Sequence, residues 1–122
     1  MATRRDPVTP GGRVEAGLAY PVPPREGRIL VEVLNTTDRT GLARVAARVL
    51  RQEGIDVIFT GNDARAPGGT RIVVRRGDAS RGRIVARALG IGDVTQDPDT
   101  LRRVDISVYL SDDYRPVLPL HP

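Results

Sequence analysis

The stretch Val31–Leu50, VEVLNTTDRTGLARVAARVL, decides the fold, because its apolar period changes within a few residues. Residues 28–35, RILVEVLN, place Ile29, Val31 and Val33 on one side of an extended chain, and this period of two predicts a strand. From residue 42 onward apolar side chains recur at positions 42, 45, 46, 49 and 50. This spacing predicts an amphipathic helix over about 39–53, with Gly54 as its stop.

Between the two patterns lies NTTDRTG, residues 35–41, which is either a ligand-binding loop or only a turn. As a turn, it offers Thr37 or Asp38 as an acceptor for the first free amides of the helix. The side chain of Asn35 can hydrogen-bond to nearby backbone and hold the turn.

The same two periods recur downstream. Alternating residues predict strands over 55–60, 70–75 and 104–110. Helical spacing predicts a second helix, with Asp78 or Ser80 as its cap and Gly90 as its end. Residues 94–100 are expected to add a short extra edge strand. The segment GNDARAPGG, residues 61–69, is expected to be an ordinary hairpin connection.

The order strand, helix, strand, strand, helix, strand predicts an α+β fold of the ferredoxin-like split βαβ type (βαββαβ), in which two helices cover one face of an antiparallel sheet. In the common strand order for this plan, which is fourth, first, third, second, the uncovered face shows apolar and charged residues together. A chain of 122 residues with 39% hydrophobic residues supports one domain. We place it at residues 28–114, after a disordered Pro/Gly/Arg-rich leader, residues 1–27, and before a Pro-rich tail, residues 115–122.

Groups that carry catalysis or bind metals are scarce. The chain has no Cys, and its one histidine, His121, lies in the tail, where nothing can orient it as a base. The paired acids at 97 and 99 and at 112 and 113 lack the spacing of a calcium loop, so they are read as solvated turn acids. We therefore expect no catalytic residue, no metal site and no cofactor.

All 19 basic residues are arginines, set against 15 acids. The densest run comprises Arg71, Arg75, Arg76, Arg81, Arg83 and Arg87, and it is either an anion site at the start of the second helix or a solvated surface. The predicted strand TRIVVR has no aromatic residue for base stacking, so nucleic acid is an unlikely partner. No window is apolar enough for a membrane span, and no secretory signal follows the N-terminus, which suggests a cytoplasmic protein if the chain is complete as written.

The run VEVLNTTDRTGLARVAARVLRQEGIDVIFTGN resembles the LytR C-terminal domain family, whose typical pattern is V-x-V-L-N-G-T-G, then G-L-A, an amphipathic helix, G-[FY]-x-V and G-N. Downstream, TRIVVRRGDASRGRIVARALG and VDISVYLSDDY continue the likeness over residues 28–114. Matching positions are Asn35, Thr37, Gly41, Leu42, Gly54, Gly61, Asn62, Asp105, Asp113 and Tyr114. The sequence departs from the family at Thr36, Asp38 and Ser111, where glycine is usual.

This resemblance implies a small domain found behind LytR-CpsA-Psr domains and in stand-alone, membrane-anchored bacterial proteins, and thus an extracytoplasmic setting. It implies a non-catalytic module of the cell envelope that binds peptidoglycan glycan, an anionic wall polymer or a wall-assembly protein. Our candidate binding residues are Glu32, Arg71, Arg75 and Tyr109 on the open sheet face, with Asn35 and Thr37 in the loop after the first strand. The alternative is a scaffold domain that forms a homodimer through Leu30, Leu34, Ile58 and Val73 on that face.

Overall fold

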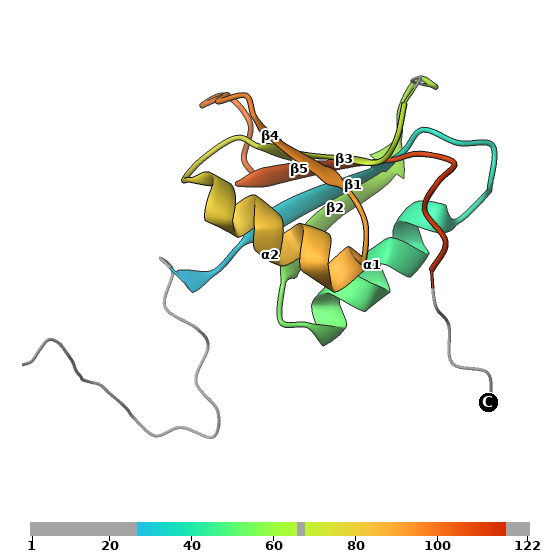
Figure 1. Ribbon diagram of the computed structural model, residues 1–122, viewed down its shortest axis with the longest axis horizontal. Coiled ribbons are helices and arrows are strands. Elements are labelled where there is room, and N and C mark those ends of the chain that lie inside the picture. The colour runs from blue at the N-terminus through green and yellow to red at the C-terminus, as the bar shows by residue number, and fades with distance from the viewer. Residues whose placement is uncertain (1–26, 66–67, 117–122) are drawn as a thin grey trace, which may run out of the picture.

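The computed structural model describes residues 27–65 and 68–116. In chain order the elements are β1 (Leu30–Asn35), α1 (Leu42–Gln52), β2 (Asp56–Asn62), β3 (Arg71–Val74), α2 (Ala79–Leu89), β4 (Asp93–Gln96) and β5 (Ile106–Leu110) (Figure 1). The predicted elements are thus all present, including the short extra strand, which is β4. The predicted leader and tail lie almost wholly outside the described residues, so both stay predictions.

The strands form one mixed sheet in the order β2-β1-β5-β3-β4. β1 runs parallel to β2 and to β5, and β3 runs parallel to β4, whereas β3 and β5 are antiparallel. Each helix therefore connects two neighbouring parallel strands, so that β1-α1-β2 and β3-α2-β4 are two βαβ units.

The α+β class is confirmed, but the ferredoxin-like topology and the antiparallel sheet were wrong. The prediction placed the last strand at an edge, whereas β5 lies between β1 and β3. Its small residue Ser107 is fully buried on the side away from the helices, as befits a central strand covered on both faces. Alternation along a strand identifies its two faces, but it does not identify its neighbours in the sheet.

The connection after β2 is also not a hairpin. β2 is an edge strand, and the chain passes the ends of β1 and β5 before it enters the sheet again as β3. The backbone N–H of Asp63 donates to the carbonyl of Asn35 at 3.0 Å. On the far side of the crossing, the Asp113 carboxylate accepts from the backbone N–H and the hydroxyl of Thr70, at 3.0 and 2.7 Å.

Both helices lie on one face of the sheet, as predicted (Figure 1). They cover a core that includes the fully buried side chains of Val31, Val33, Ile72, Ile106 and Val108. Of the two caps predicted for α2, Asp78 is the one used: its carboxylate accepts from the backbone N–H of Ser80 at 3.0 Å, and the helix ends at its C-cap, Gly90. Hydrogen bonds from the Ser80 hydroxyl and from its backbone N–H lower the pKa of Asp78, and the charges of Arg83 and Arg81 add to the shift.

α1 begins differently from the prediction. Its N-cap is Gly41, whose φ of 83° lies in the left-handed region, and no side chain caps the helix. Thr37 instead accepts from the backbone N–H of Arg39 within the preceding loop, at 3.0 Å. The helix therefore starts later than predicted, and its first amides have no side-chain acceptor.

Phe59 lies on the open face of the sheet, although alternation from Val57 would place it in the core. A β-bulge opposite Val31 and Glu32 shifts the register, so that Glu32 pairs with Phe59. The ring is 53% exposed and lies over Gly61, where a Cβ atom would be 2.9 Å from it. Gly61, which has no Cβ atom, therefore leaves room for this ring.

Candidate functional site

The open sheet face brings together four of the six candidate binding residues. The register aligns Glu32, Ser107 and Val73 in one row across β1, β5 and β3, and it pairs Tyr109 with Arg71 in the next row. Arg75 follows β3 at the end of the same face. These four residues therefore share one face of the sheet, although the strand order differs from the predicted one.

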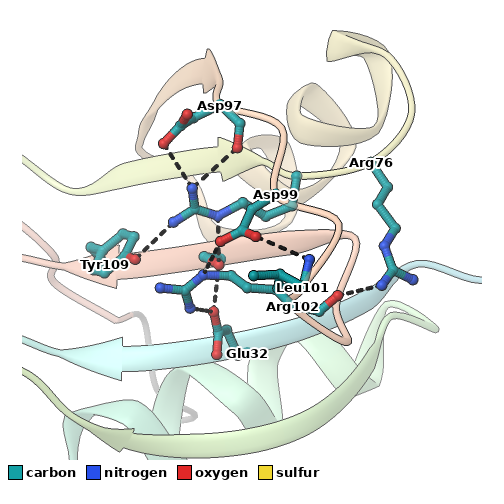
Figure 2. A network of polar contacts seen from close by, with 9 residues as sticks. Glu32, Arg76, Asp97, Asp99, Leu101, Arg102 and Tyr109 are labelled. Carbon is teal, nitrogen blue, oxygen red and sulfur yellow. Dashed lines mark hydrogen bonds and ion pairs between the residues drawn. The ribbon is translucent and has the colours of Figure 1, made fainter.

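A polar network on this face includes Glu32, Asp97 and Tyr109 (Figure 2). Arg75 links its members through several hydrogen bonds. It is only 7% exposed, and each nitrogen of its guanidinium has a partner. Nε donates to the Ser107 hydroxyl at 3.2 Å, Nη2 donates to the Tyr109 hydroxyl at 2.9 Å, and Nη1 donates to the Asp97 carboxylate at 2.9 Å. Nη1 also donates to the Asp97 carbonyl at 3.1 Å, so four of the five N–H groups are used within the fold. A buried guanidinium is stable only with such partners, so Arg75 serves mainly the fold.

Glu32 is committed in the same way. Its carboxylate accepts from the Ser107 hydroxyl and from Nη1 of Arg102, each at 2.5 Å (Figure 2). Arg102 belongs to residues 97–105, here called the strap, which connect β4 to β5 and lie over the open face (Figure 2). Burial by itself lowers the pKa of Arg102, but the charges of Tyr109, Glu32 and Asp99 raise it overall.

Arg71 remains accessible on the open face. Its guanidinium carbon lies 4.7 Å from the centroid of the Tyr109 ring, which is a cation–π contact. Because Arg71 covers one side of the ring and Arg75 binds the hydroxyl, Tyr109 is a support for arginines and not an open stacking platform.

The remaining two candidates, Asn35 and Thr37, line a separate hollow of about 370 Å³. It lies between the ends of β1 and β2 and the start of α1, and its other lining residues are Asp38, Arg39, Thr40, Gly41, Ala43, Arg44, Thr60, Gly61 and Asn62. In sheets with parallel strands, ligands commonly bind at this end of the strands. Its volume is within the usual range for small-molecule sites.

Asn35 builds this loop and is buried. Its amide oxygen accepts from the backbone N–H of Thr37 at 2.9 Å and from the Thr37 hydroxyl at 2.6 Å. Its amide nitrogen donates to the carbonyl of Arg39 at 2.7 Å, as expected of a residue that holds the turn. The side chain of Arg39 is turned toward the carbonyls of Ser111 and Asp112, both at 3.3 Å.

The accessible groups of the hollow were not among the candidate binding residues, although Asn62 is one of the positions that match the family pattern. Thr40, Arg44 and Asn62 are exposed. Arg44 makes no hydrogen bond or ion pair with any residue in the described part of the chain, and the single lining carboxylate, Asp38, pairs with Arg65 at 3.2 Å. These groups could be found only from the parallel pairing of β1 with β2, which places Asn62 beside Asn35. An antiparallel sheet does not predict that neighbourhood.

Two of the motif acids have structural roles. Asp105 accepts from the backbone N–H of Leu30 at 2.9 Å and pairs with Arg81 at 3.3 Å. Asp113 holds the end of the long crossing at Thr70. Asp105 thus holds the start of β1, which is the end of the strand away from the hollow.

No group of His, Asp or Glu side chains in residues 27–65 and 68–116 is arranged to hold a metal ion. Within these same ranges, neither helix has the length and apolar character needed to cross a bilayer.

Three comparisons with known proteins were made. The solution structure of the C-terminal domain of RV0431 is similar to this chain, with a TM-score of 0.47 and 24% sequence identity over 85% of this chain and 88% of that one. No curated protein sequence matches the chain significantly. The family model described as LytR cell envelope-related transcriptional attenuator matches residues 28–114, and the chain therefore belongs to this family of cell-envelope-related LytR C-terminal domains.

Proposed function

We propose that this domain is a non-catalytic binding module of the bacterial cell envelope, and that it binds a cell-wall polymer in the hollow after β1. The hollow itself carries the proposal, because it is a concave site whose exposed lining groups are not used by the fold. The candidates on the open face, by contrast, are largely committed to one another.

The chemistry of the lining suits a glycan or an anionic wall polymer. Thr40 and Asn62 offer a hydroxyl and an amide, which can both donate to and accept from sugar hydroxyls. Arg44 offers a planar, permanently charged donor group for a carboxylate or phosphate. Glycoside hydrolysis commonly needs two carboxyl groups, whereas Asp38 is alone here, and this supports binding without catalysis.

Retention on purified peptidoglycan at low salt tests this proposal. Thr40→Trp fills the hollow, and Thr100→Trp places the same bulk at an exposed position on the strap. Arg44→Gln removes the unpartnered guanidinium of the hollow, and Arg103→Gln removes an exposed one elsewhere. We expect the parent and the two controls to be retained, and both hollow variants to be lost. A folded parent that is not retained, or equal retention of all four variants, would refute the proposal.

Self-association is a second candidate, favoured by exposed apolar side chains on the open face. Of the four residues predicted for this interface, Leu34 and Val73 are buried within the chain, whereas Ile58 is 49% exposed. Phe59 beside it is exposed as well. Because the chain has no Cys, Ile58→Cys would form an intermolecular disulfide only between two copies. A mass of one chain by light scattering at high concentration, with no such disulfide, would exclude this role.

A further inference from the structure

Arginine is the only charged residue in either helix. α1, LARVAARVLRQ, and α2, ASRGRIVARAL, each contain three arginines and no acid. Surface helices usually mix charges of both signs, since like charges four residues apart are mildly destabilising. Arg44 with Arg48, and Arg83 with Arg87, are such pairs. The acids of the described chain lie in its strands, turns and loops.

Except for Arg81, these arginines occupy positions on the outer side of the helix layer. In α1, positions 44, 48 and 51 form one stripe, and the buried residues Ala43, Ala46 and Leu50 lie on the opposite side of the helix. In α2, positions 83 and 87 lie away from the buried residues Gly82, Val85 and Leu89. The helices contact each other on one face of the sheet, so the two stripes belong to one surface of the molecule (Figure 1).

Three of the six helix arginines have roles within the fold. Arg81 pairs with Asp105. Arg51 donates to the carbonyl of Val57 at 2.8 Å, and Arg87 lies in the last turn of α2, where a cation is favourable.

The other three, Arg44, Arg48 and Arg83, are exposed and form no hydrogen bond or ion pair with any residue that the structure describes. Arg44 also lies in the first turn of α1, where the helix dipole disfavours a cation. The lack of Lys in this chain explains why these cations are arginines. It does not explain why neither helix contains an acid.

We infer that the outer surface of the helix layer binds a linear phosphate-bearing polymer. The envelope setting of this polymer rests on the proposed function, whereas the surface itself is separate from most of the hollow. Arg44 lines the hollow and also begins the stripe on α1, so a chain held in the hollow can continue along the helix. A bilayer fits less well, because Ile84 is the one large apolar side chain exposed on the two described helices.

Binding of a purified, fluorescently labelled glycerol-phosphate polymer, measured by anisotropy over a range of NaCl concentrations, tests this inference. The double variant Arg48→Gln/Arg83→Gln leaves the hollow intact. The matched control, Arg103→Gln/Arg115→Gln, loses the same charge at exposed positions outside the helices. We expect the helix variant to bind at least about tenfold more weakly and the slope of log affinity against log salt to fall by about two, one for each lost phosphate contact. The control should change less than about twofold, as distant rim charges usually do.

Equal weakening of both double variants would overturn the inference, because it would show an effect of net charge alone. Tighter binding of the parent to anionic lipid vesicles or to DNA than to the polymer would overturn it as well. Retention on peptidoglycan stripped of phosphate polymers distinguishes binding in the hollow from binding on the helix surface. Arg48→Gln/Arg83→Gln should still be retained on it, whereas Thr40→Trp should not.

Discussion

Tyr114 buries a hydroxyl group that has no hydrogen-bond partner within residues 27–65 and 68–116. The side chain is 1% exposed within the core, and burial raises its pKa above the usual 10.0. An unpaired buried polar group costs about 1–3 kcal/mol. Tyr114→Phe should therefore increase the free energy of unfolding by roughly 1 kcal/mol, measured by urea denaturation.

The same residue gives a dependence on pH. Because the pKa is raised in the folded state, the unfolded chain loses this proton first as the pH rises through 10.0. The contribution of Tyr114 to the free energy of unfolding is thus constant below pH 10.0 and decreases above it. The stability advantage of Tyr114→Phe over the parent should grow above pH 10.0, and an unchanged difference would contradict the assignment.

Arg75 is the second residue with a defined energetic role. Lysine at this position keeps the charge but cannot reach Ser107, Tyr109 and Asp97 together. We expect Arg75→Lys to lower the free energy of unfolding by about 1–3 kcal/mol, because buried partners lose their hydrogen bonds. Arg103→Lys, at an exposed site, is the control and should change stability by less than about 0.5 kcal/mol. Equal stability of the two variants in urea denaturation would show that the network does not hold the strap.

Residue types alone predicted the roles of some side chains and not of others. Asn35 and Asp78 act within a few residues of their own positions, so local sequence was sufficient to predict them. Arg75 appeared to be a binding residue, because its burial depends on the strap and on β5, which are distant in sequence. Phe59 could not be placed, because a bulge leaves no clear mark in the alternation.

At the scale of elements, α2 packs closely against the sheet through Gly82. A Cβ atom at this position would lie 2.6 Å from Val94 and 2.8 Å from Val74. Alanine favours a helix over glycine by about 1 kcal/mol, but overpacking costs about 1–3 kcal/mol. We expect Gly82→Ala to lower the melting temperature despite its higher helix propensity. Addition of Val94→Ala should recover part of the loss, and if Gly82→Ala alone is stabilising, the close contact is wrong.

The elements themselves were predictable, because each one is marked by periodicity and by a terminal signal such as Asp78 or Gly90. The start of α1 was the exception. Thr37 and Asp38 have the right chemistry for an N-cap, but Thr37 is used inside the loop that Asn35 organises, and the chain needs Gly41 to turn into the helix. Thr37 could either cap the helix or hydrogen-bond within the loop, and only the three-dimensional structure of the loop shows which of the two occurs.

For the whole molecule, the sequence does not state which strands become neighbours. Two strand-helix repeats fit both the ferredoxin-like order and the observed order, since faces and helix positions are the same in both. The difference lies in the long crossing from β2 to β3, which the sequence alone made look like a hairpin. The predicted hairpin also left no place for the hollow. The ends of β1 and β2, which line the hollow, come together only when these two strands are parallel neighbours.

The parallel pairing of β1 with β5 also sets how the domain responds to force. The described chain enters at the start of β1 and leaves after the end of β5, so these two points lie at opposite ends of adjacent strands (Figure 1). A pull on both points loads the hydrogen bonds between β1 and β5 together, in shear. β3 and β5 are antiparallel, so a pull that peels β3 from β5 breaks the hydrogen bonds between these two strands one after another.

Single-molecule pulling can compare these two directions in the same protein. Because the chain has no Cys, introduced thiols give unambiguous handles, with Gly27→Cys and Arg115→Cys for shear and Arg71→Cys and Asp112→Cys for peeling. We expect a higher unfolding force in the shear direction, and equal forces would contradict it. The β1–β5 pair is then the mechanical clamp of the domain, able to carry tension between whatever is attached on either side.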